Sequence, residues 1–188
     1  MSDVPSLRDR LDTVRGLLED EEVRSISRRY FISNGFDGTL TSIGVVVGAY
    51  LSGVADGPTV ITIGLGAAVG LGTSGVWSVW EIERAEKQAE LLALERAMLT
   101  DLDDTAIQQR RAGARKINAV ASGIGPLIGV LLPLIPFLGQ GVVVSMLEAT
   151  LLAIAVGVCV LFTFGAYLGA ISKQNWIVVA ILNLFLPG

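Results

Sequence analysis

Two acidic residues lie inside apolar segments of the sequence, where a carboxylate is unusual. Asp37 follows Gly35 and precedes Gly38 in SNGFDGTL, at the start of the first long apolar segment, and Glu148 lies near the outer end of the fourth. Insertion scales put the cost of an aspartate in hydrocarbon at about 3 kcal/mol, so such groups persist where they face protein or water. Two acids at opposite depths suit a path that carries ions one way and protons the other. For Glu148, a carboxylate that snorkels outward to water is an equal alternative.

Oxygen-bearing side chains surround Asp37. Asn34 and Thr41 are each about one helical turn away on the same helix face. A carboxylate with a neighbouring amide and hydroxyl can partly replace the water shell of a cation. The alternative is a structural role, in which Asp37 caps a helix or pairs with Arg28 or Arg29.

A second group of carboxylates lies in residues 78–99, which contain no Gly or Pro and are predicted to form a helix. Glu83, Glu86 and Glu90 fall on one face of this helix. Clustered carboxylates suit divalent cations, so the three could collect metal at a cytoplasmic mouth. The alternative is a solvated helix that packs against a second copy or against the N-terminal helix.

The composition excludes several other chemistries. The chain has one cysteine, Cys159, and no histidine, which excludes a disulfide framework, a Cys/His zinc site and histidine acid/base catalysis. We therefore predict no enzyme activity and no cofactor. Basic residues are mixed with acids and the net charge is −4, so we predict no nucleic-acid binding.

Hydropathy indicates an all-α protein that spans a membrane several times. Hydrophobic residues make up 52% of the 188, charged residues make up 17%, and the mean hydropathy is +0.62. Because about 20 apolar residues cross a bilayer, we predict five transmembrane helices, at 31–54, 58–77, 117–138, 142–171 and 176–186. The last is short, and could be a partial span, a re-entrant segment or a helix shielded by its neighbours.

The basic residues predict the orientation. Six Lys/Arg precede the first span, seven lie between the second and third, and Lys173 separates the fourth from the fifth. The positive-inside rule then puts the N-terminus in the cytoplasm and the C-terminus outside or in a lumen. The predicted regions are a cytoplasmic amphipathic helix at 1–30, spans one and two at 31–80, a cytoplasmic helical segment that continues the second span at 81–116, and spans three to five at 117–188.

Small residues recur at four-residue spacing within the spans, which is typical of membrane helices that pack closely. The pairs are Gly44 and Gly48, Gly66 and Gly70, Gly125 and Gly129, and Gly165 and Gly169.

The stretch SRRYFISNGFDGTLTSIGVVVGAYLSG resembles the first span of the vacuolar iron transporter family, and Gly35, Asp37, Gly38 and Gly48 carry the match. GLGTSGVWSVWEIERAEKQA and INAVASGIGPLIGVLLPLIPFLG are similar to its second and third spans. The resemblance implies a homodimer with the ion path between the two first spans. It also implies export of Fe²⁺ or Mn²⁺ from the cytoplasm in exchange for protons, with Asp37 holding metal and proton alternately.

The chain departs from the family at several positions. Tyr30 stands where the family usually has an acid, Gly72 and Val76 replace its methionine and glutamate, and the segment between spans two and three is short. Two alternatives therefore stay open. One is a carrier or channel for another small ion or solute, using the polar residues of the first span with Asn118 and Ser122. The other is a non-transporting membrane scaffold whose 78–99 helix recruits partners.

Overall fold

The computed structural model describes residues 15–16, 19–98 and 106–171, and these residues are almost entirely helical. The long helices are α2 (Glu21–Leu51), α3 (Gly57–Met98), α4 (Ala106–Leu134) and α5 (Met146–Ile171), with a 3₁₀ helix, η1 (Ile135–Gly139), between the last two. The predicted all-α fold is confirmed, with no β-strand in the described residues. The short segment predicted at 176–186 lies outside them.

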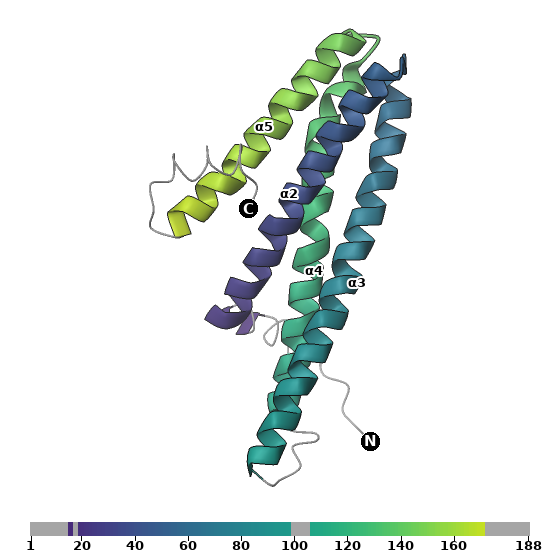
Figure 1. Ribbon diagram of the computed structural model, residues 1–188. Coiled ribbons are helices and arrows are strands. Elements are labelled where there is room, and N and C mark those ends of the chain that lie inside the picture. The colour runs from purple at the N-terminus through teal and green to yellow at the C-terminus, as the bar shows by residue number, and fades with distance from the viewer. Residues whose placement is uncertain (1–14, 17–18, 99–105, 172–188) are drawn as a thin grey trace.

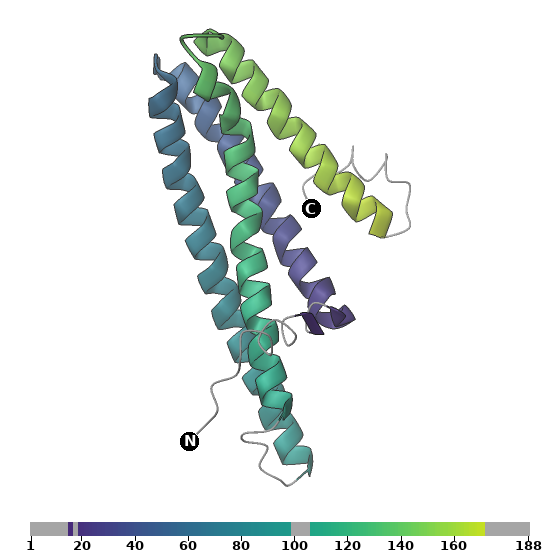
Figure 2. The same ribbon diagram turned by 180° about the vertical axis from the view of Figure 1, so that it is seen from behind.

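The helices form a bundle that opens at one end. Helices α2, α3 and α4 run side by side, while α5 meets them near η1 and diverges from them toward Ile171 (Figures 1 and 2). The buried apolar core lies at the η1 end, where Phe137 is 1% exposed and packs with residues such as Val46, Val60 and Val130. At the other end, a groove lies between α2 and α5.

Three helical segments are long and apolar enough to cross a membrane: Gly57–Glu90, Gly113–Gly139 and Met146–Ile171, with mean hydropathies of 1.5, 1.9 and 2.4. The first predicted span, 31–54, is not one of the three. Most of it lies in α2, where polar residues such as Asn34, Asp37 and Ser42 lower the hydropathy.

Helix α3 runs without a break through 42 residues, so the predicted second span does continue into a long helix. Asp56 precedes it, and its Oδ2 accepts a hydrogen bond of 2.8 Å from the Thr59 backbone N–H. A side chain that accepts from the first turn satisfies an N–H that has no partner within the helix. Hydrogen bonding to Thr59 also lowers the pKa of the Asp56 carboxyl. Asp56 is therefore a helix cap.

Helices α2 and α4 approach through glycines. A Cβ at Gly38 would lie 2.6 Å from the Pro126 Cα and O, and one at Gly129 would lie 2.5 Å from the Gly35 O. A Cβ at Gly125 would overlap the Phe31 carbonyl. The prediction of close packing is thus confirmed for Gly125 and Gly129, which approach Phe31, Gly35 and Thr39 of α2.

Two other glycine pairs do not pack against the described residues. Among those residues, a Cβ at Gly44, Gly48, Gly66 or Gly70 would meet nothing within 4 Å. These glycines lie on exposed faces of α2 and α3.

Candidate functional site

One face of α2 is joined to its neighbours by a ladder of polar side chains. Three residues about one helical turn apart each bond to a group on α3 or α4: Ser27 to Asn118, Tyr30 to Glu83, and Asn34 to Ser122. The Ser122 hydroxyl in turn donates to the Gly75 carbonyl on α3 at 2.8 Å. Hydrogen bonds between helices replace water as partners for buried polar groups and fix the register of the bundle.

Asn34, predicted to help bind an ion, belongs to this ladder. Its Nδ2 donates to the Ser122 hydroxyl and, at 3.3 Å, to the Ser122 carbonyl. Asn118 and Ser122 are fully buried within the bundle. The amide group of Asn34 therefore joins α2 to α4 rather than standing free beside Asp37.

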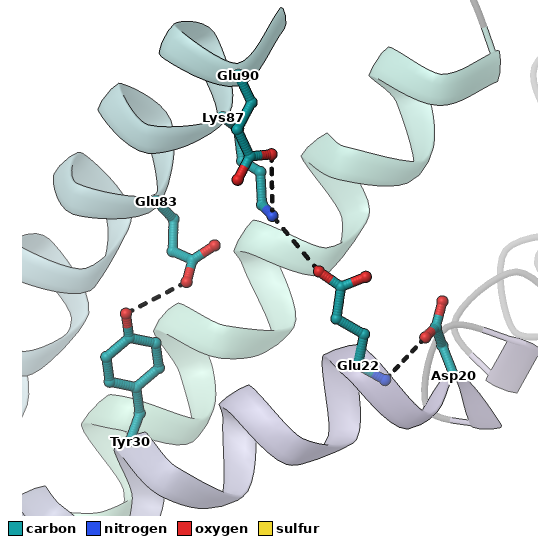
Figure 3. Close-up of polar contacts among 6 residues, drawn as sticks. All are labelled: Asp20, Glu22, Tyr30, Glu83, Lys87 and Glu90. Atoms are coloured by element: carbon teal, nitrogen blue, oxygen red, sulfur yellow. Dashed lines mark hydrogen bonds and ion pairs between the residues drawn. The ribbon is translucent and has the colours of Figure 1, made fainter.

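Glu83 is buried between α3 and α2, with only 2% of its surface exposed. The Tyr30 hydroxyl donates to Glu83 Oε1 at 3.2 Å, and Glu83 Oε2 has no hydrogen-bond partner in the described part of the chain (Figure 3). Arg115 on α4 packs on Trp80, three residues before Glu83, with its guanidinium carbon 4.3 Å from the centre of the ring. Burying a carboxylate without hydrogen-bond partners costs free energy. Glu83 is nevertheless buried, so we assign it to the interior of the bundle and not to its surface.

Glu86 and Glu90 stay at the surface, apart from Glu83. Both are exposed, and Lys87 Nζ lies 3.5 Å from Glu90 Oε2 and 3.7 Å from Glu22 Oε1, which links α3 to α2 (Figure 3). Within the described ranges, no three acidic or cysteine side chains come together in a group that could hold a metal. The structure thus separates the predicted metal collectors into one buried and two exposed carboxylates.

Asp37 is not part of this ladder. Its side chain is exposed, and no hydrogen bond or ion pair joins its carboxylate to the residues that the structure describes. Thr41, one turn further along, is half-buried. The structure contains no ion pair between Asp37 and Arg28 or Arg29, as the alternative structural role would require.

Asp37 lines a groove of about 370 Å³ between α2 and α5. Two arginines and two serines of α2 also line the groove, and two residues near the end of α5 form part of its wall. The α2 residues are Arg28, Arg29, Ser25 and Ser33, and the α5 residues are Leu168 and Ile171. The groove thus brings Asp37 and the two arginines to one surface, with one negative and two positive charges.

Glu148 has a different place in the fold. It lies in the first turn of α5, where its Oε2 accepts a 2.7 Å hydrogen bond from the Ser145 N–H, and its own N–H donates to the Ser145 hydroxyl at 3.3 Å. This reciprocal pair is a capping box. The geometry accounts for an exposed acid at this position, and a transport role for Glu148 stays a prediction.

The buried ladder was only partly visible in the sequence. The sequence indicates Asn118 and Ser122 as polar residues of the third span, but it does not connect Ser27 or the Tyr30–Glu83 pair to them. The signal was the spacing of Ser27, Tyr30 and Asn34, which share one face of a helix.

We expect Glu83→Ala to destabilise the protein and Glu83→Gln to have a smaller effect. Alanine leaves the Tyr30 hydroxyl without its partner, which costs about 1–3 kcal/mol, whereas the glutamine amide oxygen can still accept from it. Thermal unfolding of the purified protein, with exposed Glu86→Ala as control, measures the difference. Equal unfolding midpoints for Glu83→Ala and Glu86→Ala would contradict an interior role for Glu83.

Comparison with known proteins gives one family and one relative. The model of the VIT family matches residues 78–188, from the middle of α3 onward. An uncharacterized protein of Methanocaldococcus jannaschii is 30% identical over 179 residues, which cover 94% of this chain and 86% of the relative. No solved structure matches the chain.

Proposed function

The chain belongs to the VIT family, and we propose that it exports a divalent metal ion, Fe²⁺ or Mn²⁺, from the cytoplasm in exchange for protons. Family membership and three apolar helices support an integral membrane protein that transports metal ions and is not an enzyme. One residue supports the proposal most directly. Asp37 is an exposed carboxylate with no partner in the described chain, and it lies next to membrane-spanning helices.

We propose that the transporter is a homodimer. An exposed stripe runs along α2 and includes Ser33, Asp37, Leu40, Gly44 and Gly48. A lone copy would turn the Asp37 carboxylate toward lipid, which is unfavourable. Pairing the stripe with that of a second copy would cover it, because the open glycines allow close helix contact, and would bring two Asp37 carboxylates near one another.

In this arrangement the Asp37 carboxylate does the chemistry. Carboxylate oxygens bind hard and borderline divalent cations, and a proton that binds the same oxygens competes with the metal. A proton that arrives from the outer side would replace the metal on the Asp37 carboxylate, and the metal would leave to that side. The release of the proton to the cytoplasm would then complete the exchange. The exposed hydroxyl of Ser33 and the half-buried hydroxyl of Thr41 are the nearest side-chain oxygens along α2, and Glu148 at the start of α5 is a proposed exit residue.

The exposed carboxylates of α3 are proposed to raise the local metal concentration before transport. Replacing both with glutamine (Glu86→Gln with Glu90→Gln) should raise the half-saturating metal concentration several-fold and leave the maximal rate unchanged, because neither residue touches the Asp37 groove. Initial rates of metal uptake test this, with Glu81→Gln, also exposed on α3, as control. A fall in the maximal rate alone would count against metal collection by this surface.

A second candidate function is a carrier for another small ion or solute. The specific observation is that Arg28 and Arg29 line the same groove as Asp37. Two guanidiniums beside one carboxylate repel a cation that enters there, and they attract an anion or a zwitterion.

The test is flux into proteoliposomes of the purified protein, measured for Fe²⁺, Mn²⁺, Co²⁺ and Zn²⁺ with a proton-sensitive dye inside. The proposal expects entry of at least one metal together with proton movement the other way. Metal entry without proton movement would overturn antiport, and no metal entry from folded, dimeric protein would favour the second candidate.

A further inference from the structure

Two buried polar side-chain atoms in the described part of the chain lack a hydrogen-bond partner, and they belong to groups of opposite charge. One is Oε2 of Glu83 on α3, and the other is Nε of Arg115 on α4. Glu83 is 2% exposed, and Arg115 packs its guanidinium on Trp80, one turn before Glu83 on α3. No ion pair within 4 Å joins the two residues in the described structure. An acid and a base thus lie close together along the bundle without bonding to each other.

The other ionisable side chains around Glu83 already have partners, and Figure 3 shows two of them. From α2, the Tyr30 hydroxyl donates to Oε1 of Glu83 at 3.2 Å, and the Arg29 guanidinium carbon lies 5.5 Å from the centre of the Tyr30 ring. On α3, Lys87 lies one turn further along and pairs with two carboxylates, and Arg84 pairs with an exposed carboxylate of the same helix. Oε2 of Glu83 therefore remains available for a proton or for the basic group on α4.

We propose that Glu83 is a proton-binding site that takes up the proton released from Asp37 and passes it to the cytoplasm. The Tyr30 hydroxyl gives its proton to Oε1 of Glu83 while the Tyr30 oxygen accepts the incoming proton, so one O–H bond forms for each that breaks. The neutral acid avoids the cost of burying an unpaired charge. When the proton leaves to cytoplasmic water, Oε2 of the carboxylate takes the Arg115 guanidinium as its partner, because hydrogen bonds between charged groups are the stronger ones. Each of the two orphaned atoms then has a state in which it is used.

This inference rests on the proposed exchange of metal for protons, which needs a route for the proton between Asp37 and the cytoplasm. Tyr30 lies seven residues before Asp37 on α2, or about 10.5 Å along the axis at 1.5 Å per residue. Seven steps of about 100° come within about 20° of two full turns, so the two side chains share a helix face. The exposed hydroxyl of Ser33 lies between them, and water on this face completes the route. The orientation predicted from the sequence places Tyr30 on the cytoplasmic side of Asp37.

The first experiment detects the proton without metal. Infrared spectra of the purified protein in detergent are recorded across pH, because a protonated carboxyl group absorbs apart from carboxylates. We expect an acid band that Glu83→Gln removes and that Glu81→Gln, an exposed control on α3, leaves in place. Arg115→Gln removes a cation that favours the carboxylate, so the band should persist to higher pH, and Arg115→Lys should restore the wild-type range. A wild type without this band, a band that Glu83→Gln leaves unchanged, or an Arg115→Gln variant that titrates like the wild type would overturn the proposal.

The second experiment tests whether transport uses this proton, with Mn²⁺ as the probe in proteoliposomes. Exchange of labelled for unlabelled Mn²⁺ needs no proton release, whereas net Mn²⁺ uptake against protons does. A positioned acid or base typically speeds proton transfer by about 10²- to 10⁴-fold, so Glu83→Gln should lower net uptake at least about tenfold and lower exchange much less.

Glu81→Gln is again the control and should change neither rate. Equal loss of exchange and net uptake in Glu83→Gln would indicate a structural role, and undiminished net uptake would place the proton route elsewhere; either result overturns the proposal. A wild type that moves no Mn²⁺ in either assay would overturn proposed Mn²⁺ transport and the relay with it, whereas the proton site itself stands or falls on the infrared result.

Discussion

Asp37→Asn is expected to stop coupled metal flux and to leave the protein folded. Asparagine keeps the size of the side chain but removes the negative charge and the proton-binding oxygen. A hydrogen bond or ligand contact with a charged group is worth about 1.5–3 kcal/mol, so metal affinity should fall about 10- to 100-fold. Folding should be unaffected because Asp37 is exposed and has no bonded partner in the described structure.

Metal and proton flux in proteoliposomes measure this effect, with thermal unfolding of the same samples as a check on folding. Thr73→Ala is the control, since it removes an exposed hydroxyl of α3 that lies outside the groove and carries no charge. Undiminished flux in Asp37→Asn would remove Asp37 from the ion path. Loss of folding in Asp37→Asn, with no flux in the wild type, would instead favour the scaffold alternative.

The sequence predicted the helices well because hydropathy and the absence of Gly and Pro are local properties. The continuous α3 is the clearest case, since residues 78–99 contain neither breaker and continue an apolar segment. The resemblance at Asp37 lies in α2, which the family model that matches residues 78–188 does not cover.

The burial of individual residues could not be predicted in the same way. Glu83, Glu86 and Glu90 share a helix face by periodicity, yet only Glu83 is covered, because Tyr30 of α2 reaches it. The groove depends on the divergence of α5 from α2, a tertiary feature. Periodicity gives the face of a helix, but it does not say how far along that face a neighbour extends.

Glycine spacing shows a similar limit. Four pairs had the same spacing, but a Cβ at Gly44, Gly48, Gly66 or Gly70 would meet nothing within 4 Å in the described part of the chain. On α2, the Gly125–Gly129 surface approaches Phe31, Gly35 and Thr39, and Gly38 packs against Pro126. Which glycine faces a neighbour depends on the rotation of each helix in the bundle.

The largest effect on stability is expected at the contact between α2 and α4. Gly38→Ala should destabilise the protein because its Cβ would lie 2.6 Å from backbone atoms of Pro126, and backbone cannot rotate away as a side chain can. Overpacking of this kind typically costs about 1–3 kcal/mol, and the better helix propensity of alanine recovers about 1 kcal/mol at most. Gly129→Ala should behave likewise.

Gly66→Ala is the matched control, since it lies in α3 with open space around it and should be neutral or slightly stabilising. Unfolding midpoints of the three variants in one detergent provide the comparison. If Gly38→Ala and Gly66→Ala unfold together, the close approach of α2 and α4 is wrong.

The Gly38→Ala substitution also tests whether helix packing affects transport. Gly38 is buried against α4, whereas its neighbour Asp37 is exposed on another face of α2, because successive residues in a helix point about 100° apart. Contact with Pro126 therefore fixes the direction in which the Asp37 carboxylate points. Gly38→Ala should lower flux per folded molecule as well as stability, while Gly66→Ala should change neither. A Gly38→Ala protein that is destabilised but transports normally would show that the position of Asp37 does not depend on this contact.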